Sequence, residues 1–145
     1  MLAPLQLSRA RIALELGAGT GAVTQYLLDA LPASSTLLVF EINRRFCNHL
    51  RRKFQDPRMV LINANVANLD AELHRRGYDH VDAVASSLGL GFMSETQRNQ
   101  IFQSLMPFLR EKDLTNLTKS KGVASAVVAQ ANKLMSQRRG GRDKK

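Results

Sequence analysis

The 145-residue chain has little of several features that mark particular classes of protein. It holds a single cysteine, Cys47, so no disulfide can form within the chain, as is usual in a reducing compartment. No apolar run reaches the roughly 18 residues that a membrane-spanning helix needs. The first residues lack the basic start and the long apolar stretch of a secretory signal. These absences predict a cytoplasmic protein, with at most peripheral contact with a membrane.

The excess of positive charge is confined to two short segments. The formal net charge is +9, and residues 44–53 hold five Lys/Arg and no acid, while residues 138–145 hold five Lys/Arg and one acid. Such segments attract phosphates of nucleic acid or of anionic lipid. The alternative is a solvated helix face and a solubilising tail. We expect residues 1–137 to form one domain and residues 138–145 to be a disordered basic tail.

Buried-strand patterns alternate with helical patterns over most of the chain. Strands are expected at residues 11–16, 35–42, 58–65 and 80–90. Helices are expected at residues 20–31, after Asn43, at 69–77 and at 94–110. Alternation of this kind predicts an α/β protein, with a Rossmann-like parallel sheet flanked by helices. The sequence thus predicts four strands.

Two of the expected helices begin with capping residues. Asn43 is a suitable N-cap for the second helix, and Ser94 followed by Gln97 is a capping-box pattern. Spacing predicts that the helix after Asn43 buries one face, made of Phe46, Leu50 and Phe54. Residues 122–135 fit a helix better than a strand.

A glycine-rich turn follows the first expected strand, in the segment ALELGAGTGAVT at residues 13–24. Gly17, Gly19 and Gly21 stand between a strand and a helix, which is a geometry that brings backbone close to a ligand. A dinucleotide would place its pyrophosphate over such a turn, where the carboxylate of Glu15 would repel it. S-adenosylmethionine carries a sulfonium and an ammonium group and has no phosphate, so Glu15 favours that cofactor.

Polar residues also follow the second and third expected strands. Glu41 can accept hydrogen bonds from the two hydroxyls of a ribose, and Asn63 and Asn65 can meet an adenine edge. Carboxyl ends of parallel strands meet at one edge of a sheet, so these side chains are expected to converge. Alternatively, Glu15 is a salt-bridge partner and Glu41 is an acid that favours a helix start.

Three segments together resemble class I S-adenosylmethionine-dependent methyltransferases: LELGAGTGAVTQYLL, LLVFEINRRFCNHLRRKF and VDAVASSLGL. The resemblance is greatest to the bacterial phospholipid N-methyltransferase branch, which is related to the ribosomal RNA adenine dimethyltransferases, and it covers about residues 11–111. It implies a set of cofactor-binding residues: Glu15, Gly17, Gly19, Gly21, Glu41, Ile42, Asn65 and Val66. It places the methyl acceptor at Ser86, Ser87 and Leu88.

The chain departs from that pattern at several places. Gly89 stands where the phospholipid branch has proline, and residues 86–89 lack the Asn and Tyr with which the RNA adenine enzymes hold a base. The segment before the first strand is short, and the last strands of the sheet are not recognisable, so we expect a domain shortened at both ends. The free sheet edge would then be covered by residues 114–137 or by a second copy of the chain.

Three functions follow from these patterns. The first is methyl transfer to an amine, with a phospholipid head group such as phosphatidylethanolamine as acceptor and with residues 44–53 and 138–145 on an anionic membrane. The second is methyl transfer to an adenine of ribosomal RNA. The third is a non-catalytic remnant that binds S-adenosylmethionine. The reaction needs no metal, and His49, His74 and His80 are on different expected elements, so no metal site is predicted.

Overall fold

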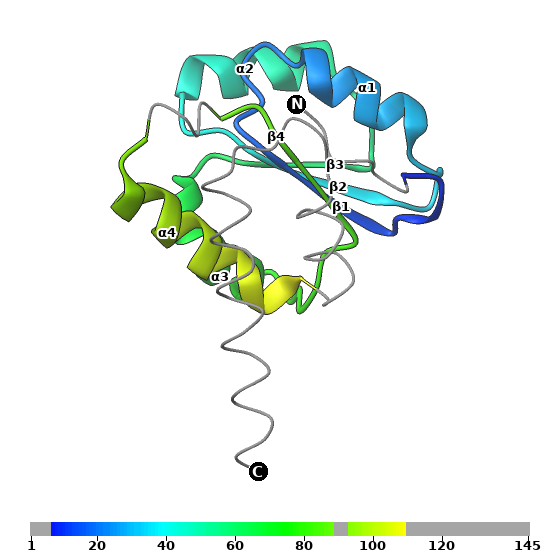
Figure 1. Ribbon diagram of the computed structural model, residues 1–145. Coiled ribbons are helices and arrows are strands. Elements are labelled where there is room, and N and C mark those ends of the chain that lie inside the picture. The colour runs from blue at the N-terminus through cyan, green and yellow to red at the C-terminus, as the bar shows by residue number, and fades with distance from the viewer. Residues whose placement is uncertain (1–6, 89–92, 110–145) are drawn as a thin grey trace.

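The structure is a computed structural model that describes residues 7–88 and 93–109. These residues form a parallel β-sheet with helices on both of its faces (Figure 1). The predicted α/β class is therefore confirmed. Three predictions lie outside the described residues: the basic tail, the helix at 122–135, and the cover of a sheet edge by 114–137.

The four predicted strands are all present and all parallel. They are β1 (Ile12–Leu16), β2 (Thr36–Phe40), β3 (Met59–Ile62) and β4 (Ala83–Ser86). Their order in the sheet is β3-β2-β1-β4, with β1 paired to both β2 and β4. The chain moves outward from β1 in one direction and then returns to its other side. Ligands in open α/β sheets bind at such a reversal, beyond the carboxyl ends of the strands.

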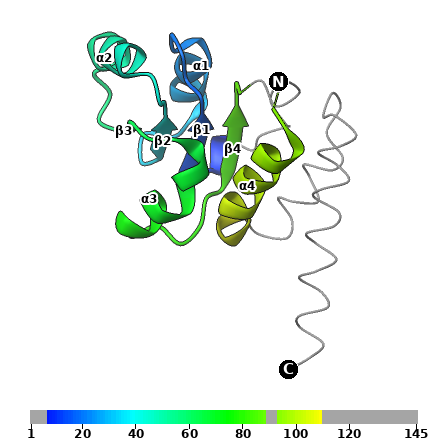
Figure 2. The same cartoon turned by 90° about the vertical axis from the view of Figure 1, so that its left-hand side faces the viewer.

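Helices α1 (Ala22–Ala30) and α2 (Arg44–Lys53) lie side by side over one face of the sheet. Helices α3 (Leu69–Arg75) and α4 (Glu95–Leu105) cover the other face (Figure 2). Short 3₁₀ segments stand at Leu7–Arg9, Val66–Asn68 and Met106–Phe108. Among the described helices, none has the length and apolar composition of a bilayer span.

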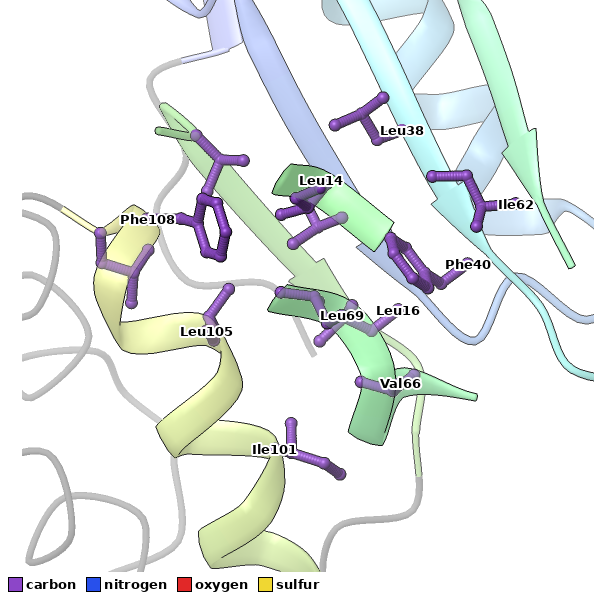
Figure 3. Packing of buried hydrophobic residues seen from close by; sticks show 13 residues of the cluster. Leu14, Leu16, Leu38, Phe40, Ile62, Val66, Leu69, Ile101, Leu105 and Phe108 are labelled. Carbon is purple, nitrogen blue, oxygen red and sulfur yellow. The ribbon is translucent and has the colours of Figure 1, made fainter. Parts of the chain in front are cut away.

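Alternate residues of each strand point into two different cores. The core under α3 and α4 takes Leu14, Leu38 and Phe40 from the sheet and Leu69 and Phe108 from the other layer (Figure 3). The core under α1 and α2 contains the neighbouring strand residues, several of them alanines: Ala13, Leu37, Val39, Ala83 and Ala85.

Both predicted helix starts are confirmed. Asn43 Oδ1 accepts hydrogen bonds from the backbone N–H of Arg45 (2.9 Å) and of Phe46 (3.3 Å). Ser94 and Gln97 form the reciprocal bonds of a capping box. These side chains satisfy N–H groups that a helix leaves without partners in its first turn.

The predicted buried face of α2 is wrong in one residue. Leu50 and Phe54 are buried, but Phe46 is 38% exposed and Cys47 takes the inward place, fully buried. Cys47 Sγ lies 3.3 Å from the carbonyl oxygen of Glu41, toward the sheet. Helical spacing places Cys47, Leu50 and Phe54 on one face as readily as it places the predicted Phe46, Leu50 and Phe54. Phe46 was predicted because its side chain is larger and more apolar than that of Cys47.

Removing the cap of α2 should destabilise the protein measurably. We expect Asn43→Ala to lower the free energy of unfolding by about 1 kcal/mol, because two N–H groups lose their acceptor. Asn48→Ala is the matched control, since Asn48 is exposed on the same helix. Among described residues, the Asn48 side chain forms a hydrogen bond only with the Arg51 side chain. Urea unfolding of both variants tests this, and equal losses would contradict the capping role.

Candidate functional site

The glycine turn runs from the end of β1 to the start of α1, at the carboxyl edge of the sheet. Gly17, Gly19 and Gly21 all have positive φ, at 75°, 55° and 94°. Residues with a side chain rarely adopt a backbone conformation with positive φ, so the turn depends on glycine at each of these positions. The turn is tied to the sheet by the Gly17 N–H, which donates to the Phe40 carbonyl at 2.9 Å.

Each glycine makes room for something different. A Cβ on Gly17 would lie 2.5 Å from Leu88 Cδ2, and one on Gly21 would lie 2.7 Å from Phe54 Cε2 and 2.9 Å from Leu50 Cδ2. A Cβ on Gly19 would meet nothing within 4 Å. Gly17 and Gly21 therefore serve close packing within the chain, while Gly19 faces open space where a ligand can approach.

Glu41 joins the glycine turn to the start of α2. Its Oε1 accepts the Gly19 N–H at 2.8 Å, and its Oε2 accepts the Asn43 N–H at 2.9 Å. The side chain is nearly buried, with 7% exposed. Each carboxylate oxygen keeps a further lone pair, so a carboxylate held in this way can also accept the hydroxyls of a ribose. Two predicted site residues are thereby brought together.

Glu15 lies in the core between β1 and α1 and is fully buried. Thr24 Oγ1, in the first turn of α1, donates to its Oε2 at 2.7 Å. Its Oε1 has no hydrogen-bond partner among the described residues. Burial raises the pKa of the Glu15 carboxyl. The hydrogen bond from Thr24 lowers this pKa, and the nearby charge of Glu41 raises it, but burial is the largest of the three effects. An unpaired buried carboxylate oxygen is costly unless a ligand or water donates to it.

The raised pKa of Glu15 should make stability depend on pH. The pKa of Glu15 in the folded protein lies above the ordinary value of 4.5, so the folded state binds this proton more tightly than the unfolded state does. The stability that results is fully present below pH 4.5 and is lost as the pH rises through the folded pKa. Glu15→Gln keeps an acceptor for Thr24 and cannot ionise, so its unfolding midpoint in urea should fall less above pH 4.5. Glu95→Gln, an exposed carboxylate on α4, is the control and should keep the wild-type slope.

The two asparagines that were predicted to meet the adenine both form hydrogen bonds within the protein. Asn63 Nδ2 donates to the carbonyls of Glu41 (2.9 Å) and Ile42 (3.0 Å), so this side chain braces the turn after β2. Asn65 Oδ1 accepts the Ala67 N–H at 2.9 Å and caps the 3₁₀ segment that begins at Val66. The side chain of Ile42 is 63% exposed beside Glu41, which suits a flat apolar partner.

Of the predicted acceptor residues, Ser86 is the last residue of β4, the neighbour of β1, and Ser87 and Leu88 follow it. The Ser87 N–H donates to the Leu16 carbonyl at 3.0 Å, and the Leu88 N–H donates to Ser86 Oγ at 3.3 Å. Leu88 also packs against Gly17. The structure therefore places the predicted acceptor segment directly beside the glycine turn.

Two contacts at the site were not foreseen from the sequence. Thr24 is the partner of Glu15, and Lys53 Nζ donates to the Thr20 carbonyl at 3.2 Å. A threonine in the first turn after a glycine loop is a signal that could have been used. His49 is on α2, His74 is on α3 and His80 is in the connection before β4. Within residues 7–88 and 93–109, no three side chains of the metal-binding types form a group.

Residues 13–113 match the family model described as a methyltransferase domain. This chain belongs to that family. The match spans β1, the glycine turn, Glu41 and the end of β4, so membership covers the whole described site. It confirms the class I methyltransferase resemblance and, with it, S-adenosylmethionine as the expected cofactor.

Two curated relatives of this methyltransferase domain act on different substrates. The ornithine lipid N-methyltransferase of Singulisphaera acidiphila is 33% identical over 92 residues, which are 62% of this chain and 48% of that protein. The ribosomal RNA small subunit methyltransferase H of Aromatoleum aromaticum is 28% identical over 120 residues, 81% of this chain and 38% of that protein. The chain therefore spans about half of the length of these relatives, or less.

The fold is also found in a solved structure of distant sequence. Fibrillarin from Aeropyrum pernix, determined with natively bound S-adenosyl-L-methionine, superposes with a TM-score of 0.62. The two chains are 15% identical, and the likeness covers 91% of this chain and 58% of fibrillarin. This likeness confirms the Rossmann-like arrangement of the methyltransferase domain.

Proposed function

We propose that the protein transfers a methyl group from S-adenosylmethionine to the amine of a lipid head group. The observation that carries the proposal is the bond from the Gly19 N–H to Glu41 Oε1, which fixes an acid for ribose hydroxyls beside an open glycine. The lipid relative, an ornithine lipid N-methyltransferase, supports an amine on a lipid as acceptor. A head group such as that of phosphatidylethanolamine has the same chemistry.

The site's own residues fit the charge of this cofactor. Glu15 offers a buried carboxylate oxygen without a partner among described residues, which suits a positively charged group, directly or through a water. The same carboxylate would oppose a pyrophosphate over the turn. Glu41 would hold the ribose, and Ile42 would contact the adenine ring.

The proposed acceptor approaches at Ser86, Ser87 and Leu88. S-adenosylmethionine supplies a methyl group on a positively charged sulfur, so the protein needs no covalent nucleophile. Ser86 Oγ accepts the Leu88 N–H and still has its own proton to donate, with which it can orient an incoming group. Holding two reactants in line is the main contribution that such a site makes to the rate.

A second candidate is methyl transfer to ribosomal RNA. The relative that acts on small-subunit ribosomal RNA supports it, as do the five Lys/Arg of α2, which suit phosphates. Ser86, Ser87 and Leu88 lack an amide and an aromatic ring with which to hold a flipped base, and this favours the lipid acceptor.

Calorimetric titration tests the cofactor. We expect S-adenosylmethionine to bind and NAD not to bind. Glu41→Ala should weaken S-adenosylmethionine binding at least tenfold, since hydrogen bonds to a charged group are worth about 1.5–3 kcal/mol each. Asp29→Ala, an exposed carboxylate on α1, is the control and should bind as wild type does. Tight binding of NAD, or unchanged binding by a folded Glu41→Ala variant, would contradict the proposal.

Transfer of a labelled methyl group tests the acceptor. Three acceptors are offered in separate reactions: ornithine lipid, phosphatidylethanolamine and small-subunit ribosomal RNA. The two lipids are dissolved in detergent. Label in a lipid amine is the expected result. Label in RNA alone would establish the second candidate, and cofactor binding without transfer to any acceptor would indicate a non-catalytic binding protein.

A further inference from the structure

We infer that α2 is a docking helix that seats the protein on an anionic lipid bilayer, beside the cofactor site. The inference deepens the proposed lipid function and rests on it. The surface concerned is called the α2 basic surface and consists of exposed residues on one helix: Arg44, Arg45, His49, Arg51 and Arg52.

The arginines of the α2 basic surface form no ion pair with any described residue. Other arginines are paired: Arg58 with Asp56, and both Arg75 and Arg76 with Glu72. Unpaired, solvated cations on a single helix are available to an external anionic surface.

The helix is anchored firmly to the sheet on its opposite side. Cys47 and Leu50 are fully buried and Phe54 nearly so, while the other eight residues of α2 are exposed. Arg45, His49 and Arg52 recur at the spacing of one helical stripe, directed away from that buried side. A surface docked on this stripe would meet a rigid part of the fold.

Helices α1 and α2 each carry one exposed aromatic side chain. Phe46 on α2 is 38% exposed, and Tyr26 on the neighbouring helix α1 is 56% exposed. Helices α1 and α2 lie side by side on the same face of the sheet (Figures 1 and 2). Basic and aromatic side chains are both common in segments that lie in a membrane interface. Phosphates alone would not require the apolar part, so a bilayer fits better than RNA.

The α2 basic surface adjoins the cofactor site through the same helix. Asn43, the cap of α2, donates its N–H to Glu41, and Lys53 at the other end reaches the Thr20 carbonyl in the glycine turn. Gly21 packs against Leu50 and Phe54. A bilayer held at α2 would therefore lie beside the edge of the sheet at which a lipid amine has to arrive.

Vesicle flotation of the full chain tests the inference without cofactor or acceptor. We expect binding to vesicles of phosphatidylglycerol and phosphatidylcholine in equal parts and none to phosphatidylcholine alone. Binding should fade in about 1 M salt, where the Debye length falls to about 3 Å. Arg45→Gln/Arg52→Gln should weaken it about tenfold or more, by the usual contribution of two basic residues near an anionic surface.

Arg9→Gln/Arg11→Gln is the matched control. It removes the same charge from two exposed arginines at the amino end of β1, the opposite edge of the sheet from Asn43. Equal losses for the two double variants would overturn the inference, because binding would then follow net charge and not α2. Salt-sensitive binding to RNA that needs Arg45 and Arg52, with no binding to vesicles, would overturn it in favour of a nucleic-acid surface.

Fluorescence gives a second readout at the same helix. The chain has no tryptophan, so Phe46→Trp introduces a single reporter. Its emission should shift to shorter wavelength on anionic vesicles and be quenched by brominated lipid, and an unchanged spectrum on bound vesicles would contradict insertion of α2. Because these assays do not involve methyl transfer, vesicle binding without transfer to a lipid would sink the proposed function alone, and transfer in detergent without vesicle binding would sink this inference alone.

Discussion

Gly19→Ala is expected to lower the affinity for S-adenosylmethionine at least tenfold while the protein stays folded. Gly19 has φ 55°, and a Cβ built there would point into space that holds no atom of the protein within 4 Å. A methyl group at that position therefore clashes with nothing in the free protein and stands where a ligand approaches the turn. The cost in stability is the strain of the left-handed conformation, about 1–2 kcal/mol.

Gly77→Ala is the matched control for this effect. Gly77 closes α3 with φ 83°, and a Cβ there also meets nothing within 4 Å. The two variants should thus lose similar amounts of stability in urea, while only Gly19→Ala loses cofactor affinity in calorimetry. Equal affinity of the two variants would mean that the cofactor does not approach Gly19.

Gly21→Ala is expected to have the largest effect on stability, about 2–5 kcal/mol. The added Cβ would lie 2.7 Å from the Phe54 ring and 2.9 Å from Leu50 Cδ2, both of which are buried, and φ there is 94°. Overpacking in a core costs about 1–3 kcal/mol, and the left-handed conformation adds about 1–2 kcal/mol. Urea unfolding measures the loss against wild type and against Gly77→Ala, which carries the conformational cost alone.

A double-mutant cycle separates the clash from the strain. Phe54→Leu replaces the ring that a Cβ on Gly21 would contact with a shorter side chain. Gly21→Ala should therefore lower the free energy of unfolding less in the Phe54→Leu background than in the wild type. Residues in direct contact usually show coupling energies of about 0.5–3 kcal/mol. Additive losses would show that packing against α2 is not the reason for glycine at this position.

The sequence alone was sufficient for the class of fold, for two helix starts and for the position of Glu41 beside the glycine turn. Buried-strand runs alternate with amphipathic helices, and this local pattern predicts a parallel sheet, which buries its strands between two layers of helices. Asn43 and the pair Ser94 and Gln97 cap the helices that they were predicted to cap. Glu41 was placed correctly beside the glycine turn, since the carboxyl ends of neighbouring parallel strands meet at one edge.

Only the tertiary structure decided what each of those residues touches. The turn appears in sequence as three equal glycines, yet Gly17 packs on Leu88, Gly21 packs on α2, and Gly19 alone is open. These contacts join segments that are tens of residues apart, so no local pattern can encode them. The same holds for Phe46: helical spacing allowed either Phe46 or Cys47 to point inward, and only the packing of α2 on the sheet shows that Cys47 is the buried one.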